Sequence, residues 1–394
     1  MATTHVFIVD EKTFPIHLQY MFAGTGRGKD LAKSIFDINN EGKGYHIGHV
    51  NFSLLNDISR CRIGDLVVFY LQSKALFFGV FKIKNTPYIN NNNEEASRVL
   101  SEKLSFLLPF RVDIEPHVVY PKGISEWELL DSISDVEAPY KMQWSLIYRK
   151  LKGKRGCTMI TLYEAERLIY KLSVLNNESP ITDFNHLTYK DSVIVNFDDY
   201  MQLPQEKYEF NFVPKIIEKY NSNLSYEILL QGLILQNIGK GTIESLDGVF
   251  LQNKSLNWIG NEVICSVGKQ AMDILLDTNV DTNENNRIII PIEIKDELVE
   301  EPVLEQISKY IKWLNEYYIP NIREGNIKEG IVRIEAIILS LKEIDVDENK
   351  KPNRDGYKKF KKALDSLNGK FGNAVRIKHV VYCIDNGNIV FQNM

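Results

Sequence analysis

The sequence of 394 residues has little that would set it apart from ordinary globular proteins. It contains no run of about 18 apolar residues, so we expect no membrane-spanning helix and no membrane partner. Its first residues lack a basic segment followed by an apolar one, which argues against secretion and predicts a cytoplasmic protein. Glycine (23) and proline (13) are present in ordinary numbers, which excludes fibrous and fully disordered classes.

Cysteine is scarce, and no two cysteines form a Cys-x-x-Cys pair. The four residues are Cys61, Cys157, Cys265 and Cys383. This spacing argues against a disulfide scaffold and a zinc knuckle, and it fits a reducing cytosol. Two histidines, His46 and His49, lie close together, but they have no cysteine or third ligand nearby and do not predict a zinc site.

Three widespread catalytic motifs are also missing. There is no Gly-x-Ser-x-Gly elbow and no Rossmann fingerprint after a strand. The glycines around Arg27, in GTGRGKD, lack the Gly-Lys-Ser/Thr ending of a phosphate-binding P-loop. The motifs of serine hydrolases, dinucleotide enzymes and P-loop ATPases are therefore absent.

Charge is divided unevenly along the chain, whose net charge is −5. Residues 1–175 contain 22 Lys and Arg against 19 Asp and Glu, a net charge of +3, and the remainder carries −8. An acidic back half does not suit phosphate binding unless some carboxylates hold metal ions and the front half supplies much of the contact with nucleic acid. The alternative is that the acidic residues form a solvated surface.

The first 175 residues show the pattern of a mixed α and β domain. Short apolar runs separated by Gly, Asn, Pro or charged turns predict strands of a compact sheet or barrel. Residues 124–133 and 161–172 have helical spacing, and Thr161 followed by Glu164 resembles a capping box. Residues 176–212 are weakly patterned and predict a linker, in which 193–197 could add a strand to either domain.

Residues 213–394 predict an α/β domain with a central mixed sheet flanked by helices. Helical patterns precede and follow apolar runs that read as strands, at 287–296 and 332–341. A longer amphipathic helix is expected at 303–318 and a lysine-rich one at 355–367. The Asp-Asn-Gly sequence at 385–387 predicts a tight turn in a terminal hairpin.

The strand RIIIPIEIKD carries the strongest chemical signal. Because side chains alternate between the faces of a strand, Glu293 and Lys295 share the face opposite Ile292 and Ile294. Placing a carboxylate and an ammonium on an otherwise apolar strand costs free energy unless the two groups pair with each other or serve a function. The upstream apolar run QAMDILLD contains a second isolated acid, Asp273.

If the two strands are neighbours, Asp273 and Glu293 can hold a hard divalent cation through oxygen ligands. Lys295 could then orient a water molecule or stabilise charge developing on a phosphate. This arrangement predicts metal-assisted hydrolysis of a phosphodiester. The alternative is a surface ion pair between Glu293 and Lys295 on an edge strand.

On these residues the back half resembles the PD-(D/E)XK nuclease superfamily, and especially its archaeal-type mismatch endonuclease branch. The resemblance implies that Asp273 and Glu293 bind Mg²⁺, for which Mn²⁺ can substitute, and that Lys295 is the catalytic lysine. It further implies Glu227 as an outer carboxylate acting through water and Gln306 as a helper near the metal or phosphate. One departure is that Met272 precedes Asp273 where the family name has proline.

Neighbouring residues also have ordinary interpretations. Glu227 could be a solvated helix residue, and we expect Tyr310 and Trp313 to pack in the core. The acidic residues from Asp296 to Glu301 are expected to form a solvated turn.

The front half resembles the EVE/YTH group of PUA-like domains over about residues 1–172. The resemblance rests on IGDLVVFYL, FFGVFKI, LPFRVDIEP and the closing segment IYRKLKGKRGCTMITLYEAERL. It implies an α+β fold, a PUA-like sheet or barrel with helices, whose pocket accepts a single modified base flipped out of the duplex. The pocket would stack this base between aromatic side chains.

The candidates for this pocket are aromatic residues, each of which could instead belong to the core. Our first choices are Tyr20, Phe22 and Trp144, and the others are Phe69, Phe77 and Trp127.

A glycine-broken basic segment at 149–156 could contact the DNA backbone, the alternative being a solvated turn. Its cations are Arg149, Lys150, Lys152, Lys154 and Arg155, and Arg27 is a further candidate.

Together these features predict a modification-dependent restriction endonuclease that defends against phage DNA. Its front domain would read a modified base, such as a modified cytosine, in double-stranded DNA, and its back domain would cut the backbone with Mg²⁺. Cutting both strands needs two sites, which predicts a homodimer. The alternatives are a sequence-specific restriction enzyme, a mismatch or repair endonuclease, and a catalytically inactive DNA-binding protein.

Overall fold

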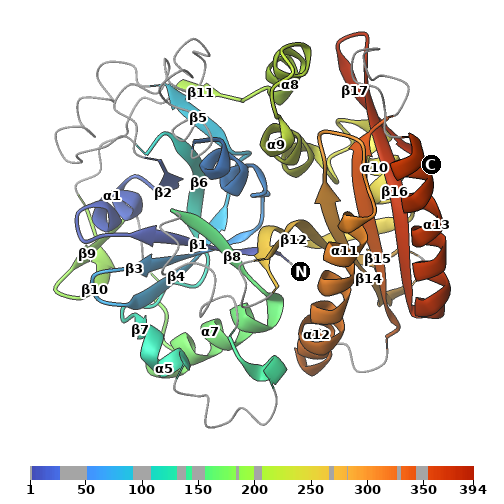
Figure 1. Cartoon of the computed structure of the whole chain (residues 1–394). Coiled ribbons are helices and arrows are strands. Elements are labelled where there is room, and N and C mark those ends of the chain that lie inside the picture. Colours follow the sequence, from blue (N-terminus) through green and yellow to red (C-terminus); the bar gives the residue numbers. More distant parts are fainter. Residues whose placement is uncertain are drawn as a thin grey trace. The chain divides into compact units, whose positions relative to one another are not determined.

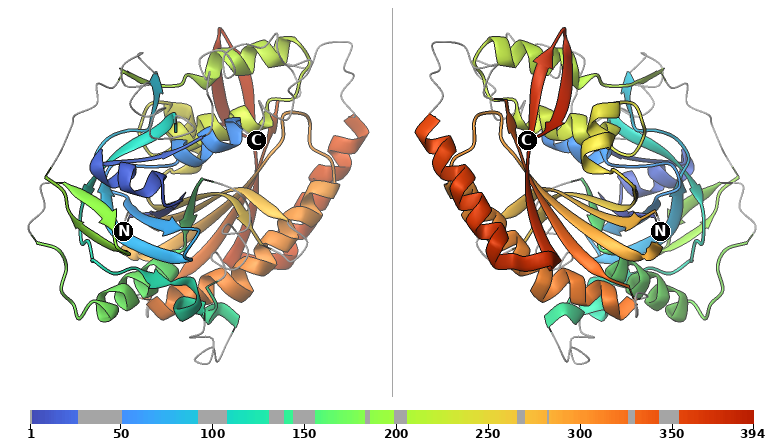
Figure 2. Two further views of the ribbon diagram at one scale, coloured as in Figure 1. Left: turned by 90° about the vertical axis from the view of Figure 1, so that its left-hand side faces the viewer. Right: turned by 90° about the vertical axis from the view of Figure 1, so that its right-hand side faces the viewer.

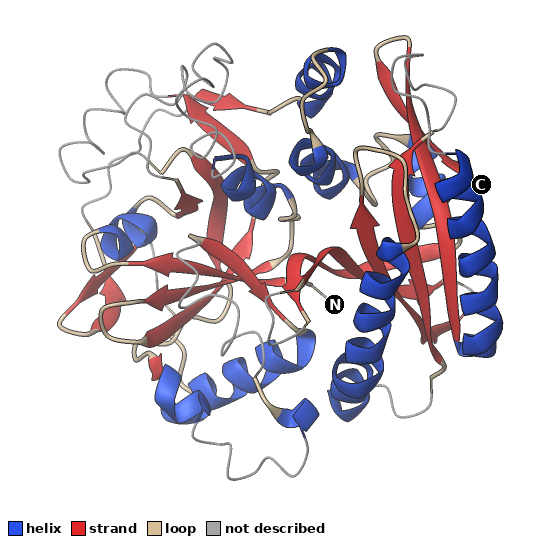
Figure 3. Cartoon of the chain, in the orientation of Figure 1, coloured by secondary structure: helices blue, strands red, loops and turns tan. Residues whose placement is uncertain are grey.

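The computed structural model contains two compact units, Met1–Phe210 and Asn211–Met394, called here the first and second units. The structure describes residues 2–26, 51–91, 108–130, 139–143, 156–182, 186–198, 206–265, 270–281, 283–325, 330–342 and 354–394. Both units combine a sheet with helices, so the fold is mixed α and β (Figure 3). None of the helices in these ranges combines the length and apolar character that crossing a membrane requires.

The first unit is built on a nine-stranded, curled sheet (Figure 1). Its elements are β1 (Thr4–Val9), α1 (Thr13–Gln19), β2 (Phe22–Thr25), β3 (Leu66–Leu71), β4 (Leu76–Ile83), β5 (Tyr88–Asn91), β6 (Phe110–Pro116), β7 (Ile124–Ser125), α5 (Glu126–Leu130), β8 (Cys157–Ile160), α7 (Leu162–Leu175), β9 (Leu187–Lys190), β10 (Val193–Asn196) and β11 (Glu206–Tyr208). A helical segment at 51–59 precedes β3.

The main path of this sheet runs β11-β5-β6-β4-β3-β1-β8, with β2 paired to β6 and β7 to β4. The strand β1 is parallel to β3 and antiparallel to β8. The predicted capping box of α7 is confirmed, since the Thr161 side chain accepts from the Glu164 backbone N–H and the Glu164 carboxylate accepts from Thr161.

The segment 176–212, which we expected to be a linker, carries three short strands of the first unit. The strands β9 and β10 pair with each other, and β11 adds to the edge of the main sheet beside β5. The division between the two units lies at Phe210 and Asn211.

The core of the first unit is rich in aromatic rings. Phe14 lies at its centre, with ring centroids 5.4 Å from Phe69, 5.2 Å from Phe78 and 5.1 Å from Tyr189. Burying several rings of this size contributes much of the apolar stabilisation of a unit this small. The same core also encloses a histidine, His17 of α1, whose Nδ1 lies 2.9 Å from the Phe22 carbonyl oxygen.

We predict that His17 makes the stability of the first unit depend on pH. Burial, with the nearby Arg111 guanidinium, lowers the pKa of His17 to about 4. As pH falls from about 6.5 to 4, the unfolded chain binds a proton that the folded chain excludes, and folding loses up to about 3 kcal/mol. The denaturant concentration at the midpoint of unfolding should therefore decrease as the pH is lowered from 7 to 4.5. It should decrease less in His17→Gln.

The exposed His117 on the same unit provides the control for this prediction. The variant His117→Gln should keep the pH dependence of the wild-type chain. An unchanged dependence in His17→Gln would show that His17 does not contribute.

The second unit is built on a six-stranded mixed sheet with the order β12-β13-β14-β15-β16-β17 (Figure 2). Its elements are α8 (Phe212–Asn221), α9 (Glu227–Asn237), α10 (Glu244–Phe250), β12 (Lys254–Ile264), β13 (Ala271–Val280), β14 (Asn283–Ile294), α11 (Pro302–Trp313), a π-helical turn (Leu314–Tyr318), α12 (Ile319–Gly325), β15 (Val332–Leu341), α13 (Arg354–Phe371), β16 (Val375–Asp385) and β17 (Asn388–Asn393).

The first three strands of this sheet form an antiparallel meander, and β14, β15 and β16 are parallel. Parallel neighbours need crossover connections, which α11 and α13 provide. The two helices contact each other, α11 packing on β14 and β15 and α13 on β16, while α9 packs on β13 and β14. The strand at 332–341 and the terminal hairpin, with Asn386 and Gly387 at positive φ, lie where the sequence predicts them.

Candidate functional site

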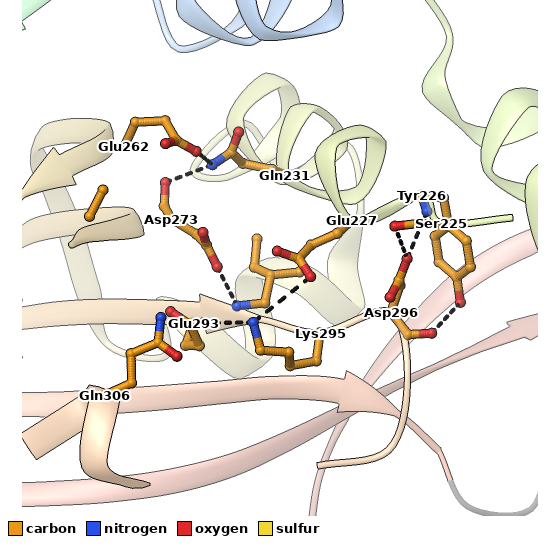
Figure 4. A network of polar contacts seen from close by, with 12 residues as sticks. Ser225, Tyr226, Glu227, Gln231, Glu262, Asp273, Glu293, Lys295, Asp296 and Gln306 are labelled. Carbon is orange, nitrogen blue, oxygen red and sulfur yellow. Dashed lines mark hydrogen bonds and ion pairs between the residues drawn. The ribbon is translucent and has the colours of Figure 1, made fainter. Parts of the chain in front are cut away.

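The acidic and basic residues predicted to form a site in the second unit lie close together near the start of β13 and the end of β14 (Figure 4). The helix α9 packs on both strands there, and α11 packs on β14. Ile274 pairs with Ile292, and continuing this antiparallel register brings Asp273 opposite Glu293. Glu293 of β14 and Lys295, the first residue after this strand, lie on one side, while Ile292 and Ile294 are fully buried on the other. The structure thus brings together the three residues on which the predicted chemistry rests.

Glu293 is buried and held by two partners. Lys295 Nζ donates to Glu293 Oε1 over 2.8 Å. The hydroxyl of Tyr310, on α11, lies 2.8 Å from Glu293 Oε2 and 2.8 Å from the Ala271 carbonyl oxygen. Gln306 Nε2 in turn donates to this hydroxyl over 2.8 Å, so Gln306 reaches the site through Tyr310.

Asp273 is held by backbone and side-chain contacts from both neighbouring elements. Its Oδ2 accepts a hydrogen bond of 2.7 Å from the Ile294 backbone N–H. Gln231 Nε2, on α9, donates to the Asp273 carbonyl oxygen over 2.9 Å and to Glu262 Oε1 over 3.1 Å. These contacts fix the position of Asp273 while its carboxylate keeps further acceptor capacity.

Glu227 lies at the first turn of α9, and its Oε2 is 3.9 Å from Lys295 Nζ. The start of this helix is tied to the end of β14 by Asp296. The Asp296 carboxylate accepts from the Tyr226 backbone N–H over 2.7 Å and from Ser225 Oγ over 2.6 Å. The prediction of a merely solvated turn is therefore wrong for Asp296, which fixes where α9 begins and so where Glu227 stands.

The site holds more negative than positive charge. Four carboxylates, from Glu227, Glu262, Asp273 and Glu293, influence one another and have Lys295 as a cationic partner. Burial, reinforced by the neighbouring carboxylates, raises the pKa of Asp273 well above its usual range and that of Glu227 to about 7. Burial alone would lower the pKa of Lys295, but Glu293 and Glu227 raise it, so the lysine stays charged.

These properties suit a divalent cation with oxygen ligands. Clustered carboxylates resist ionisation because like charges repel in a partly buried place. A bound Mg²⁺ would remove that repulsion, and carboxylate oxygens are the donors it prefers. Among the described residues, Asp273 and Glu293 are placed to hold such an ion. Tyr310 orients the Glu293 carboxylate and the Ile294 backbone N–H that of Asp273, while Gln231 holds the Asp273 backbone.

Sequence reasoning missed Glu262, Gln231 and the role of the Tyr310 hydroxyl. Tyr310 is fully buried, as expected, but its hydroxyl reaches Glu293. Gln231 could have been noticed, since it interrupts the apolar run from Ile228 to Leu235 and lies one turn after Glu227. Glu262 lies opposite Asp273 only because of the β12–β13 register, which the sequence does not reveal.

Of the three aromatic residues first predicted to line a base pocket in the first unit, the structure describes two, Phe22 and Tyr20. Phe22 is fully buried, with its ring 4.4 Å from the Arg111 guanidinium and 4.7 Å from the His17 ring. Tyr20 is half-buried after α1. Trp144 lies outside the described residues, as do Arg27 and the basic segment with Arg149, Lys150, Lys152, Lys154 and Arg155.

The other aromatic candidates divide between core and surface. Phe69 and Phe77 are fully buried and belong to the core. Trp127, on α5, has 62% of its surface exposed.

No family model and no curated protein matches this sequence. Solved structures with partial similarity include protein Atu2648 from Agrobacterium tumefaciens, at 15% identity and a TM-score of 0.27, covering 46% of this chain and 100% of that one. Human THYN1, solved in complex with DNA containing 5-methylcytosine, has 16% identity and a TM-score of 0.25, covering 44% and 97%. A hypothetical protein from Leishmania major has 12% identity and a TM-score of 0.27, covering 45% and 96%.

The contact between Tyr310 and Glu293 leads to a prediction about metal affinity. The variant Tyr310→Phe keeps the buried ring but removes the hydroxyl that orients Glu293. Loss of an outer hydrogen bond of this kind costs roughly 10- to 100-fold in metal affinity or activity. We therefore expect the dissociation constant for Mg²⁺, measured by titration calorimetry, to rise by about tenfold or more.

A second buried tyrosine provides the matched control. The Tyr318 hydroxyl lies 3.2 Å from Asp277 Oδ2, away from the carboxylates described above. Tyr318→Phe should leave the dissociation constant for Mg²⁺ unchanged, and the same result in Tyr310→Phe would contradict the role given to Tyr310.

Proposed function

We propose that this protein is a Mg²⁺-dependent DNA endonuclease whose first unit recognises a modified base. The observation that carries the proposal is the convergence of Asp273, Glu293 and Lys295, with Glu227 beside them. The chain order also agrees with the resemblance to PD-(D/E)XK nucleases. An acid on a helix is followed by an acid on β13, Glu-x-Lys at the end of β14 and Gln306 on α11.

Each residue has a task in phosphodiester hydrolysis. Asp273 and Glu293 hold the cation, which when bound lowers the pKa of a water molecule and offsets charge on the phosphate. Lys295 Nζ, charged and partly exposed, orients the attacking water and stabilises negative charge on the phosphate oxygens. Glu227 holds the lysine from the other side, and Gln306 with Tyr310 keeps the Glu293 carboxylate in place.

Recognition of a modified base rests on the resemblance of the first unit to EVE/YTH domains and on one structural feature. Asn90, on β5, is 2% exposed, and neither its Oδ1 nor its Nδ2 has a hydrogen-bond partner among the described residues. A buried amide without partners is costly, and such groups mark places where a ligand completes the hydrogen bonds. An amide offers one donor and one acceptor to a base edge.

Cationic and aromatic groups lie beside this amide. Lys207 pairs with Asn90 across β11 and β5, and its Nζ is 4.7 Å from the Tyr88 ring centroid. Arg111 pairs with Tyr88 across β5 and β6. Lys207 is also paired with the Asp113 carboxylate, and Tyr88 and Arg111 are buried, so a base that reaches Asn90 would have an aromatic ring and two cationic groups beside it.

The direct test uses the intact protein and supercoiled plasmid DNA carrying 5-methylcytosine. We expect nicked and linear products with Mg²⁺ or Mn²⁺ and none with a chelator. Cutting both strands requires two sites, so active protein should be a homodimer in solution. Binding without cleavage under every metal condition would instead support an inactive DNA-binding protein.

A further inference from the structure

A second cluster of metal-ligating side chains lies in the first unit and has no part in the proposed hydrolysis. It consists of His5 on β1, Cys61 after the helical segment 51–59, and Cys157 on β8. One donor atom from each of the three lies within 4.8 Å of the other two, and all three residues are fully buried.

The fold assembles this cluster from three distant parts of the sequence. The strands β1 and β8 are antiparallel neighbours, with Phe7 paired to Cys157 and His5 to Met159, so His5 and Cys157 are diagonal neighbours. The Cys61 backbone N–H donates to the Ile58 carbonyl oxygen, which holds Cys61 at the end of its helix. Both thiols are free, so they are not consumed by a disulfide.

The orientation of His5 is fixed as in many metal sites. Its Nε2 lies 2.8 Å from Asp65 Oδ2. Asp65 is itself held by the backbone N–H groups of Thr3, over 3.0 Å, and Arg62, over 2.9 Å. A carboxylate that binds one ring nitrogen directs the other toward a metal ion.

The second ring nitrogen of His5 is left for such an ion. Among the described residues His5 Nδ1 has no hydrogen-bond partner, and a ring nitrogen of His5 lies within 4.8 Å of the Cys157 sulfur. Burying an imidazole nitrogen without such a partner is costly. A ligand at this nitrogen would remove the cost.

We propose that His5 Nδ1, Cys61 Sγ and Cys157 Sγ bind one Zn²⁺. Imidazole nitrogen and thiolate sulfur are the donors that zinc prefers. Two ligands on one tetrahedral zinc lie about 3.5–4 Å apart, so donors already within 4.8 Å of one another need only small movements. The Asp57 carbonyl oxygen, 3.9 Å from both sulfurs, is placed as a fourth donor.

The charges and protons of this reaction balance. Binding of Zn²⁺ displaces one proton from each thiol, so the ion and the two thiolates together are neutral. Arg60, whose Nη2 lies 3.3 Å from Cys157 Sγ and whose Nη1 lies 3.0 Å from Asp57 Oδ1, donates a hydrogen bond to one thiolate. The bound ion would connect β1, β8 and the helical segment, and so stabilise the first unit.

This zinc site is independent of the proposed hydrolysis. Its donors are nitrogen and sulfur in the first unit, whereas the carboxylates of the second unit offer oxygen. Failure of one proposal therefore leaves the other standing.

The test is the zinc content of the full-length protein, purified without chelators or a histidine tag and measured by mass spectrometry of the metal. We expect one zinc per chain in the wild type and a loss of most of it in Cys61→Ser and Cys157→Ser. Cys265→Ser and Cys383→Ser are the matched controls, because these buried cysteines lie in the second unit. Both controls should retain the metal.

Cobalt spectroscopy tests the same proposal even if the serine variants fold poorly. Wild-type protein refilled with Co²⁺ should show thiolate-to-cobalt charge-transfer bands and the visible bands of tetrahedral cobalt. Asp65→Asn, which weakens the hold on His5, should shift these bands. Folded wild-type protein that takes up neither zinc nor cobalt would overturn the proposal, as would a Cys61–Cys157 disulfide that persists in protein purified under reducing conditions.

Discussion

Replacing Asp273 with asparagine is expected to reduce Mg²⁺-dependent DNA cleavage by roughly a thousandfold or more. The asparagine oxygen can still accept the hydrogen bond from the Ile294 backbone N–H, so the strand register is preserved. What is lost is the charge that holds the cation opposite Glu293. Cleavage of plasmid DNA under single-turnover conditions measures the rate, and fluorescence anisotropy measures DNA binding, which should change little.

Two further variants separate this account from a general loss of structure. Lys295→Met removes the ammonium between Glu293 and Glu227 and should likewise abolish cleavage, although the metal ligands remain. Glu305→Gln removes an exposed carboxylate from α11, next to Gln306, and should cleave like the wild type. Cleavage at the wild-type rate by Asp273→Asn or Lys295→Met would refute the assignment of the site.

DNA containing 5-methylcytosine or 5-hydroxymethylcytosine is expected to be cut roughly 10- to 100-fold faster than the same unmodified DNA. An unmodified cytosine can stack and hydrogen-bond in the same way, so the preference comes from the added group, and one extra carbon in a fitted apolar pocket is worth about 1–3 kcal/mol, which corresponds to roughly this range. Asn90→Ala should remove most of the preference, because a pocket without this amide no longer holds the flipped base in place for the modification to be read. Matched duplexes that differ only in the modification provide the measurement.

The control for this prediction is Asn196→Ala, an exposed asparagine of β10 in the same unit. It should retain the preference for modified DNA. Equal rates on modified and unmodified duplexes would favour a sequence-specific restriction enzyme or a mismatch or repair endonuclease over our proposal.

The features that the sequence predicts well are those that depend on nearby residues. The capping box of α7 and the terminal hairpin depend on a few adjacent positions, and both are present. The proximity of Asp273 and Glu293 could be predicted because β13 and β14 are consecutive antiparallel strands. In such strands the alternation of side chains determines which residues share a face. The glutamate and lysine of β14 are two residues apart, so their contact is local as well.

The features that the sequence does not reveal depend on long-range packing. His5, Cys61 and Cys157 have no common spacing, and only the pairing of β1 with β8 and the helical segment before β3 brings them together. The strand β11 is three residues long, and its partner β5 lies far upstream, so the segment around it looks like a linker. The anchoring of α9 by Asp296 likewise depends on where β14 ends.

The central claim is that Asp273 and Glu293 together hold a divalent cation. Crystals of the intact protein soaked in Mn²⁺ allow this to be observed through the anomalous scattering of manganese. We expect an anomalous peak within coordination distance of one oxygen of each carboxylate, and its absence in crystals of Asp273→Asn. The claim would be contradicted if saturating Mn²⁺ gave no peak between these two side chains although the protein recovered from the same crystals cleaved DNA.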